Sequence, residues 1–348
     1  MPGRTAIGLD IGTSGVRAAE LSYGRGGVTL EKFGQVALPE GAVRDGEVVD
    51  RAVVAEALKT LWRGSGFKGK KVALGVANQR VVVRQVDLPW MPAAELKASL
   101  PLQVQDYLPL PVADCLIDFH VTEEIVDGES RVLRGLLVAA AREMVMANVG
   151  AVEAAGLRAT SVDLTSFAVL RSVGRPNGEA ATEALVDIGA RVSNLVVHSG
   201  GQPRFVRVLL SGGQDVTDAI SERLGLPGPL AEAVKQRSIE GVPEDERALA
   251  DSAVDLMLEV FVDDIRSSMN YYAASNGGFP VERVVLSGGG SLLHGVAERL
   301  ESVLHKPVVL ADPISGLHVG RTGLDEQQLA AVQPLAAVPV GLALGVIS

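Results

Sequence analysis

The stretch that decides the fold runs from Leu9 to Leu21 and reads LDIGTSGVRAAEL. An apolar run leads into Asp10, a turn with two glycines follows, and a second β-like run leaves the turn. The backbone N–H groups of such a turn can converge on phosphate oxygens, and Asp10 can hold a hydrated Mg²⁺. Arg17 can add positive charge beside the phosphates. The candidate phosphate-binding residues of the turn are Gly12, Thr13, Ser14 and Gly15.

A second copy of this pattern lies at 184–197 and reads ALVDIGARVSNLVV. When Asp10 is aligned with Asp187, the incoming strand, the acid, the glycine and the outgoing strand all coincide. Either copy alone is also compatible with a plain β-hairpin with an acidic turn. Internal repetition predicts two lobes built from one unit. Two such hairpins facing each other would hold one polyphosphate, with Gly189 and Ala190 in the second turn.

Composition narrows the class of protein. A chain of 348 residues predicts more than one domain, and a net charge of -10 argues against nucleic acid as a partner. The single cysteine, Cys115, excludes an internal disulfide and fits a reducing compartment. Histidines and the cysteine show no metal-ligand spacing. We expect no signal peptide and no membrane insertion, because no apolar run approaches the roughly 20 residues that a span needs.

Residue periodicity predicts the elements of the first half of the chain. A helix beginning after Asp50 and a segment 81–141 that is inserted into the first lobe are expected. The insertion reads as strand, helix, strand and strand, and Gly174 to Gly178 marks the boundary between lobes. The expected strands are 6–10, 16–22, 28–38, 71–77, 81–86, 115–121, 131–141 and 159–164, and the expected helices are 49–63, 93–106, 143–155 and 166–173.

In the second half, the stretch VVLSGGG at 284–290 predicts a strand that ends in Gly288, Gly289 and Gly290. Bare backbone there would let a flat ligand approach, and a helix running from Ser291 to Leu304 would place its N-terminus at the same point. A tight strand-to-helix turn without a ligand is the alternative. We further expect strands at 203–210 and 308–311, helices at 214–224, 230–237 and 250–272, an acidic loop at 240–247 and a helical stretch at 325–344.

Two DIG hairpins followed by an SGGG turn resemble the actin-like ATPase superfamily. This resemblance implies an α/β, ribonuclease H-like duplicated fold with two lobes around a nucleotide cleft, and ATP and Mg as cofactors. The hairpins would be the two phosphate loops and the glycine run the adenosine loop, with Mg²⁺ held by Asp10 and Asp187 through water. The stretch AEAVK at 231–235 resembles a nucleoside-contacting motif, which implies that Glu232 and Lys235 lie over the ribose and adenine. A solvent-facing pair on a helix is the alternative.

The same resemblance implies four structural units. The first lobe would comprise 1–80, 142–176 and 325–348, and the second 177–210 and 282–324. Residues 81–141 would form the inserted subdomain that docks a partner. Residues 211–281 would form a helical subdomain that caps the nucleoside.

Within the superfamily the chain is similar to the PilM family of type IV pilus assembly proteins. The similar stretches are IGLDIGTSGVRAAEL, ELKASLPLQVQDYLPLPVADCLIDFHV, VDIGARVSNLVV, FVDDIRSSMNYYAAS and VPVGLALG. This implies a cytoplasmic scaffold of type IV pilus assembly or of a related secretion machine. It would be peripheral at the inner membrane and bind the cytoplasmic peptide of a PilN-like protein. Pilus motor ATPases and further copies of this chain are additional partners that the resemblance allows.

Two residues depart from the family pattern. Arg17 replaces the usual lysine, which keeps the charge but changes its geometry. Thr165 stands where the family has a glutamate in V-D-x-E, so we expect slow ATP hydrolysis at most and name no catalytic residue. An actin-like small-molecule kinase, an FtsA-like filament protein and a fold that binds no nucleotide remain alternatives, although the chain lacks the basic amphipathic tail of FtsA-like proteins.

Overall fold

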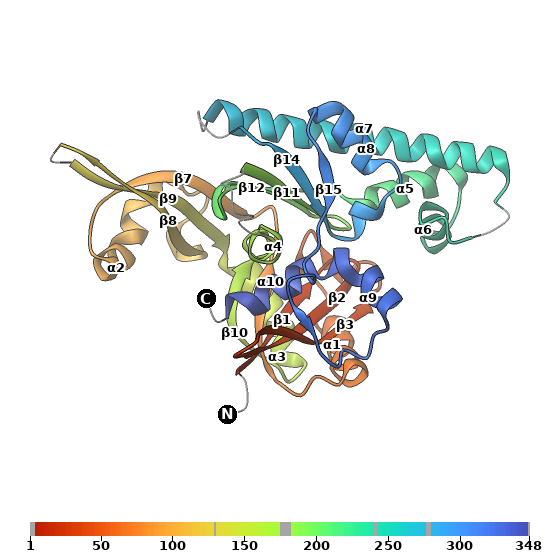
Figure 1. Cartoon of the computed structure of the whole chain (residues 1–348), viewed down its shortest axis with the longest axis horizontal. Helices are drawn as coiled ribbons and strands as arrows, with labels where there is room; N and C mark the ends of the chain where they lie inside the picture. Colours follow the sequence, from red (N-terminus) through yellow and green to blue (C-terminus); the bar gives the residue numbers. More distant parts are fainter. Residues whose placement is uncertain (1–3, 129, 175–181, 240–241, 276–279, 347–348) are drawn as a thin grey trace.

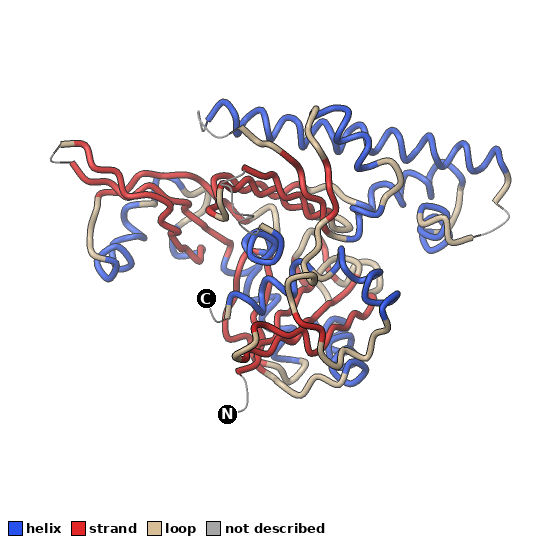
Figure 2. Tube along the Cα trace, in the orientation of Figure 1, coloured by secondary structure: helices blue, strands red, loops and turns tan. Residues whose placement is uncertain are grey.

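A computed structural model describes residues 4–128, 130–174, 182–239, 242–275 and 280–346, so the end of the predicted boundary at 174–178 lies outside the described residues. The first lobe is built on a mixed sheet in the order β10-β6-β1-β2-β3-β16 (Figures 1 and 2). Its strands are β1 (Arg4–Ile11), β2 (Gly15–Gly24), β3 (Gly27–Ala37), β6 (Lys71–Val76), β10 (Arg158–Leu164) and β16 (His318–Val319). The predicted strands of this lobe are confirmed.

The second lobe repeats the hairpin and its parallel neighbour. Its sheet has the order β13-β12-β11-β14-β15, in which β11 pairs antiparallel with β12 and parallel with β14, as β1 pairs with β2 and β6. The strands are β11 (Thr182–Ile188), β12 (Ser193–Ser199), β13 (Gln202–Leu209), β14 (Arg283–Ser287) and β15 (Val308–Leu310). The duplication inferred from the two DIG sequences is therefore present in the topology.

Helices α4 (Thr165–Val173) and α10 (Ala337–Gly345) lie between the two sheets, at the centre of Figure 1. Their apolar residues share one buried cluster with both lobes: Ala73 of β6, Ala168 of α4, Leu185 of β11 and Ala337 of α10. Helices α1 (Arg51–Ser65) and α3 (Arg142–Ala154) cover the other face of the first sheet, and α8 (Val296–Leu304) covers the second. The predicted N-cap of α1 is confirmed, because the Asp50 carboxylate accepts two backbone N–H bonds at 3.0 Å.

The inserted segment forms a three-stranded antiparallel sheet in the order β7-β9-β8. It projects from the rest of the molecule in Figure 1 and has its own small core with α2. The strands are longer than predicted: β7 (Val81–Pro89), β8 (Cys115–Asp127) and β9 (Ser130–Ala141), with α2 (Ala93–Gln103) between the first two. Two 3-10 turns, η1 (Gln105–Tyr107) and η2 (Val112–Asp114), follow α2.

The helical part of the second lobe contains α5 (Gly213–Leu224), α6 (Gly228–Lys235) and the long α7 (Glu244–Ser275). The prediction of an acidic loop at 240–247 is wrong for its second half. Glu244, Asp245 and Glu246 form the first turn of α7, where carboxylates are favoured by the positive end of the helix dipole. A run of acids was thus a helix start and not a solvated loop.

Three other predictions need correction. The helix predicted at 291–304 begins only at Val296, because Gly289–Leu292 is the 3-10 turn η3 and Gly295 has φ 81°. The stretch 325–344 divides into α9 (Glu326–Val332), the 3-10 turn η4 (Gln333–Leu335) and α10, with a 76° bend between η4 and α10. β16 joins the first sheet beside β3, although 282–324 was assigned to the second lobe.

Two short strands, β4 (Val43–Arg44) and β5 (Glu47–Val48), pair between β3 and α1 and were not predicted. Among the described residues, no single helix is long and apolar enough to cross a membrane. By length and composition alone, only the bent pair of α9 with η4 and α10 could do so, and α10 is buried from Ala337 to Ala343.

Candidate functional site

The first predicted phosphate turn is a tight connection between β1 and β2. Asp10 pairs across the hairpin with Arg17, whose guanidinium lies 3.6 Å from the carboxylate, and the N–H of Gly12 donates to Gly15 O at 3.0 Å. A Cβ at Gly12 would sit 3.4 Å from the Arg17 guanidinium and 3.9 Å from the Asp10 carboxylate. Bare backbone therefore faces the two charged groups, as a phosphate-binding turn requires.

The second predicted phosphate turn is fastened to the start of α5. Gly189 O accepts from Gly213 N at 2.9 Å, and Ala190 O accepts from Gln214 N at 2.7 Å. A Cβ at Gly189 would lie 2.4 Å from Val192 O, so the turn excludes any side chain there. The first N–H groups of α5, which a helix leaves unpaired, are thus used to hold this turn in place.

The carboxylates of Asp10 and Asp187 lie close enough to interact electrostatically. Asp187 is 8% exposed, and its pKa is raised to about 6, first by burial and then by the negative charge of Asp10. Hydrogen bonds from Ser287 and Asn194 and the charge of Arg17 oppose this rise. Burial also raises the pKa of Asp10, and Arg17 opposes it. This interaction indicates that the acidic ends of β1 and β11 lie near each other.

Asp187 belongs to a buried polar network that links four elements. Ser287 Oγ on β14 donates to the Asp187 carboxylate at 2.8 Å, and Asn194 on β12 also hydrogen-bonds to it. Ser166 Oγ on α4 donates to Asn194 Oδ1 at 2.9 Å. The sequence analysis missed these three residues. Ser287 stands directly before the three glycines, but a polar residue on a strand has no distinctive spacing, so only the fold shows what it contacts.

The glycine run closes the site from the second lobe. Gly288 has φ 79°, and its N–H donates to Pro334 O at 2.8 Å, which ties this turn to η4. A Cβ at Gly290 would collide with Ile188 at 2.3 Å, so the run packs directly behind the second phosphate turn. The backbone requires glycine at Gly288 and Gly290, but η3 follows the run in place of the expected helix N-terminus.

Lys235 and Glu232 on α6 reach the start of α5. Lys235 Nζ donates to Gly213 O at 2.9 Å and to Thr217 Oγ1 at 2.8 Å, and it lies 2.6 Å from Glu232 Oε2. Burial raises the pKa of Glu232, but hydrogen bonds from Lys235 and Thr217 outweigh it, so the net shift is downward. The Lys235 side chain is only 12% exposed. The alternative of a solvent-facing pair is therefore wrong for the lysine.

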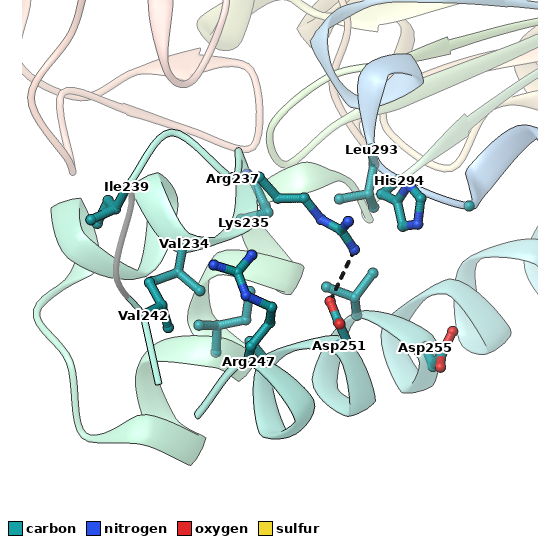
Figure 3. A pocket seen from close by; sticks show the side chains of 14 residues that line it. Val234, Lys235, Arg237, Ile239, Val242, Arg247, Asp251, Asp255, Leu293 and His294 are labelled. Atoms are coloured by element: carbon teal, nitrogen blue, oxygen red, sulfur yellow. Dashed lines mark hydrogen bonds and ion pairs between the residues drawn. The ribbon is translucent and has the colours of Figure 1, made fainter. Parts of the chain in front are cut away.

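A cavity of about 300 Å³ lies on the far side of Lys235, between α6, α7 and the loop before α8 (Figure 3). Arg237 reaches across its mouth and forms an ion pair with Asp251 at 3.2 Å, and Leu293 and His294 line the opposite wall. Ile220, Ala250 and Val254 are among its apolar lining residues, and Arg247 and Asp255 are among its charged ones. A cavity of mixed apolar and polar lining suits a small heterocycle.

Two buried polar atoms at the cleft side of the first lobe have no hydrogen-bond partner among the described residues. They are Arg17 Nε and Thr165 Oγ1. Thr165 begins α4 and is 6% exposed. Buried polar groups are nearly always satisfied, and both atoms are free to hydrogen-bond to a ligand or to water.

Two sheets of repeated topology, central helices between them and facing acid–glycine hairpins define an actin-like protein. The sequence model of the family described as "Type IV pilus assembly protein PilM" matches residues 8–346. The chain belongs to this family.

Known proteins agree with this assignment. One chain of the solved "PilM-PilN type IV pilus biogenesis complex" is 27% identical, with a TM-score of 0.86 and full coverage of both chains. The ethanolamine utilization protein EutJ from Carboxydothermus hydrogenoformans shares the fold, with 16% identity and a TM-score of 0.55 over 99% of this chain and 90% of its own. Cell division protein FtsA of Bacillus subtilis is 22% identical over 88% of this chain and 78% of its own length.

Proposed function

We propose that this protein is a cytoplasmic, nucleotide-binding scaffold of type IV pilus assembly that binds the cytoplasmic tail of a PilN-like inner-membrane protein. The observation that carries the proposal is the full-length similarity to the chain from the PilM–PilN complex. We propose the same division into two lobes, inserted subdomain and helical subdomain as above, with β16 moved to the first lobe.

The cleft fits a magnesium nucleotide. The phosphates would lie between the turns at 12–15 and 189–190, beside Arg17, whose unsatisfied Nε supports an anion there. The ribose would contact Glu232 and Lys235, and the base would enter the cavity of Figure 3. Glycines 288–290 would form the wall between them.

Asp10 and Asp187 would hold Mg²⁺ through water. Among the described residues no group of three or more His, Cys, Asp or Glu side chains could hold a metal ion, and Mg²⁺ in nucleotide sites is usually bound by one or two carboxylates together with water and phosphates. When bound, the metal neutralises phosphate charge. Without a metal, burial and Asp10 raise the pKa of Asp187. A bound cation would offset this rise, because an ion pair favours the charged form of the carboxyl group.

Hydrolysis should be slow. Thr165 occupies the position of the family glutamate, and a hydroxyl does not take up a proton at neutral pH as a carboxylate can. Its buried, unpartnered Oγ1 can hold a water molecule without activating it. Nucleotide would then act mainly by holding the lobes together across α4 and the Gly288–Pro334 contact, which a bound partner could bias.

The partner peptide would bind at the inserted subdomain. The segment from α2 to η2 exposes large apolar side chains, with Leu102 80% and Tyr107 39% exposed, and apolar side chains of this kind anchor peptides in grooves. Trp90 lies close by in sequence, with Arg131 stacked over its ring at 4.1 Å.

A calorimetric titration tests the proposal. The probe is a synthetic peptide of the cytoplasmic segment of a PilN-like protein from the same organism. Leu102→Asp is compared with Leu256→Asp, which alters an exposed leucine of α7. We expect binding to fall at least about tenfold for Leu102→Asp and to stay unchanged for Leu256→Asp, since truncated anchors commonly lose that much. No binding to the wild-type protein, with or without Mg-ATP, would refute the partner assignment.

A further inference from the structure

The amino ends of three neighbouring strands form a positively charged border of the first sheet. β10, β6 and β1 are adjacent and parallel, and they begin at Arg158, Lys71 and Arg4. The N–H of Arg158 donates to Lys70 O at 2.8 Å, which fixes the two strand starts side by side. We call the exposed residues of this border the basic edge: Arg4, Lys68, Lys70, Lys71 and Arg158.

The basic edge is unusual in this chain. The protein has a net charge of -10, yet residues 57–86 contain no aspartate or glutamate. None of the five basic-edge residues forms an ion pair within the described parts of the chain, whereas the basic residues Lys59 and Arg63 of α1 are both paired with Glu56. Unpaired cations clustered on an acidic protein indicate a surface for an anionic partner.

Acidic residues of the neighbouring strands β2 and β3 are engaged as follows. Burial raises the pKa of Glu20, and the positive charges of Lys32 and Lys68 lower it, so Glu20 lies within range of one basic-edge residue. Glu31 accepts a hydrogen bond from Ser22. Neither acid is paired with the other four basic-edge residues.

The basic edge points away from the nucleotide cleft. Asp10 stands near the carboxyl end of β1 and Arg4 at its amino end, so about 20 Å of strand separates them. Figure 1 shows the start of β1 beside β10 at the lower border of the molecule, with the second lobe at the opposite side. A flat partner at the basic edge would therefore leave the cleft open.

We propose that the basic edge is a contact surface for the headgroups of an anionic lipid bilayer. Exposed lysines near such a surface are attracted to it without inserting into it, and the attraction falls within a Debye length. A flat row of strand starts matches a plane better than the groove of a nucleic acid, and the acidic remainder of the surface would repel a duplex. This proposal rests on the proposed function, because binding to the cytoplasmic tail of an inner-membrane protein would keep the chain near the bilayer.

Vesicle flotation tests the proposal without nucleotide or peptide. The probes are vesicles of phosphatidylcholine alone and of phosphatidylcholine with 30 mol% phosphatidylglycerol, in 50 and 500 mM NaCl. We expect binding only to the phosphatidylglycerol vesicles, and only at low salt. The variant Lys68→Glu/Lys70→Glu/Lys71→Glu should bind at least about tenfold more weakly.

The matched control is Arg207→Glu/Arg223→Glu/Arg321→Glu, which changes the net charge equally at exposed cations elsewhere. It should retain binding within about twofold to threefold, because it leaves the basic edge intact. A milder variant, Lys70→Gln/Lys71→Gln, covers the case in which charge reversal prevents folding, and it should weaken binding in the same direction.

Three results would overturn the proposal: no vesicle binding by the wild type, equal binding to both vesicle types, or equal loss in the reversed and control variants. Tighter binding of a DNA oligonucleotide than of the anionic vesicles would also do so, by showing a nucleic-acid surface. Because no nucleotide or peptide enters the assay, these failures would leave the proposed function standing. Failure of Mg-ATP or PilN-peptide binding would likewise leave the vesicle result intact.

Discussion

Replacing Asp187 with asparagine should make the ligand-free protein more stable, and increasingly so as pH rises. The pKa of Asp187 is raised from its ordinary value of 3.8 to about 6 in the folded protein. Between these values the folded state keeps a proton that the unfolded chain has lost, so stability falls as pH rises. The penalty is absent well below pH 3.8 and complete above about pH 7, where it reaches about 3 kcal/mol.

The change in this stability penalty can be measured between pH 5 and pH 8. With these two pKa values, ionisation of Asp187 costs between about 1 and 2 kcal/mol at pH 5 and about 3 kcal/mol at pH 8. Asparagine carries no charge at either pH, and its Oδ1 can still accept from Ser287 Oγ. The advantage of Asp187→Asn over the wild type should therefore grow by roughly 1 kcal/mol over this range.

Thermal unfolding of both proteins without nucleotide or Mg²⁺, followed by fluorescence from pH 5 to pH 8, measures this difference. Asp263→Asn is the control, because it removes one carboxylate from the exposed surface of α7. The difference in melting temperature should rise with pH for Asp187→Asn and stay flat for Asp263→Asn. A flat or falling difference for Asp187→Asn would refute the view that the second hairpin buries a carboxylate beside Asp10.

The remaining predictions concern the bound state. Asp187→Ala should weaken Mg-ATP binding by about tenfold or more in calorimetry, since disturbed metal sites commonly lose that much; an unchanged dissociation constant would contradict the metal role. Ser166→Ala removes the hydrogen bond that Ser166 donates to Asn194 and should weaken Mg-ATP binding a few-fold while the circular dichroism spectrum stays the same. Unchanged affinity would show that α4 does not contribute to the site. Single-turnover phosphate release from bound ATP should be slow because Thr165 replaces an acid, and a rapid burst would show another base. Lys235→Ala should weaken binding of adenosine nucleotides but not of inorganic triphosphate, and an equal loss for both would argue against a nucleoside contact.

Much of the fold was predictable because the duplicated hairpins use residues with few alternatives. Acid-then-glycine at the end of an apolar strand favours a tight turn, and its recurrence at Asp10 and Asp187 indicated the two-lobe plan. The errors came where one residue type has two uses. Glu244 and its neighbours suit both a solvated loop and a helix N-terminus, and the glycines after Ser287 suit both a helix start and a 3-10 turn.

The candidate site was predictable only where the backbone itself requires glycine. Gly12, Gly189 and Gly290 are identifiable because a side chain at those positions would collide with neighbouring atoms or crowd the charged groups of the turn. Ser166 and Asn194 could not be found, because their role depends on α4 lying against β12, a contact set by packing between the lobes. The same holds for the cavity beside Arg237, whose walls come from three separate segments.

The central claim is that the two hairpins close around one magnesium nucleotide. A crystal structure of the protein with Mg²⁺ and a non-hydrolysable ATP analogue tests it most directly. We expect the triphosphate to lie between residues 12–15 and 189–190. We expect the metal to be bridged by water to both Asp10 and Asp187. Density for the analogue at any other place, or a metal that contacts neither carboxylate through water, would contradict it.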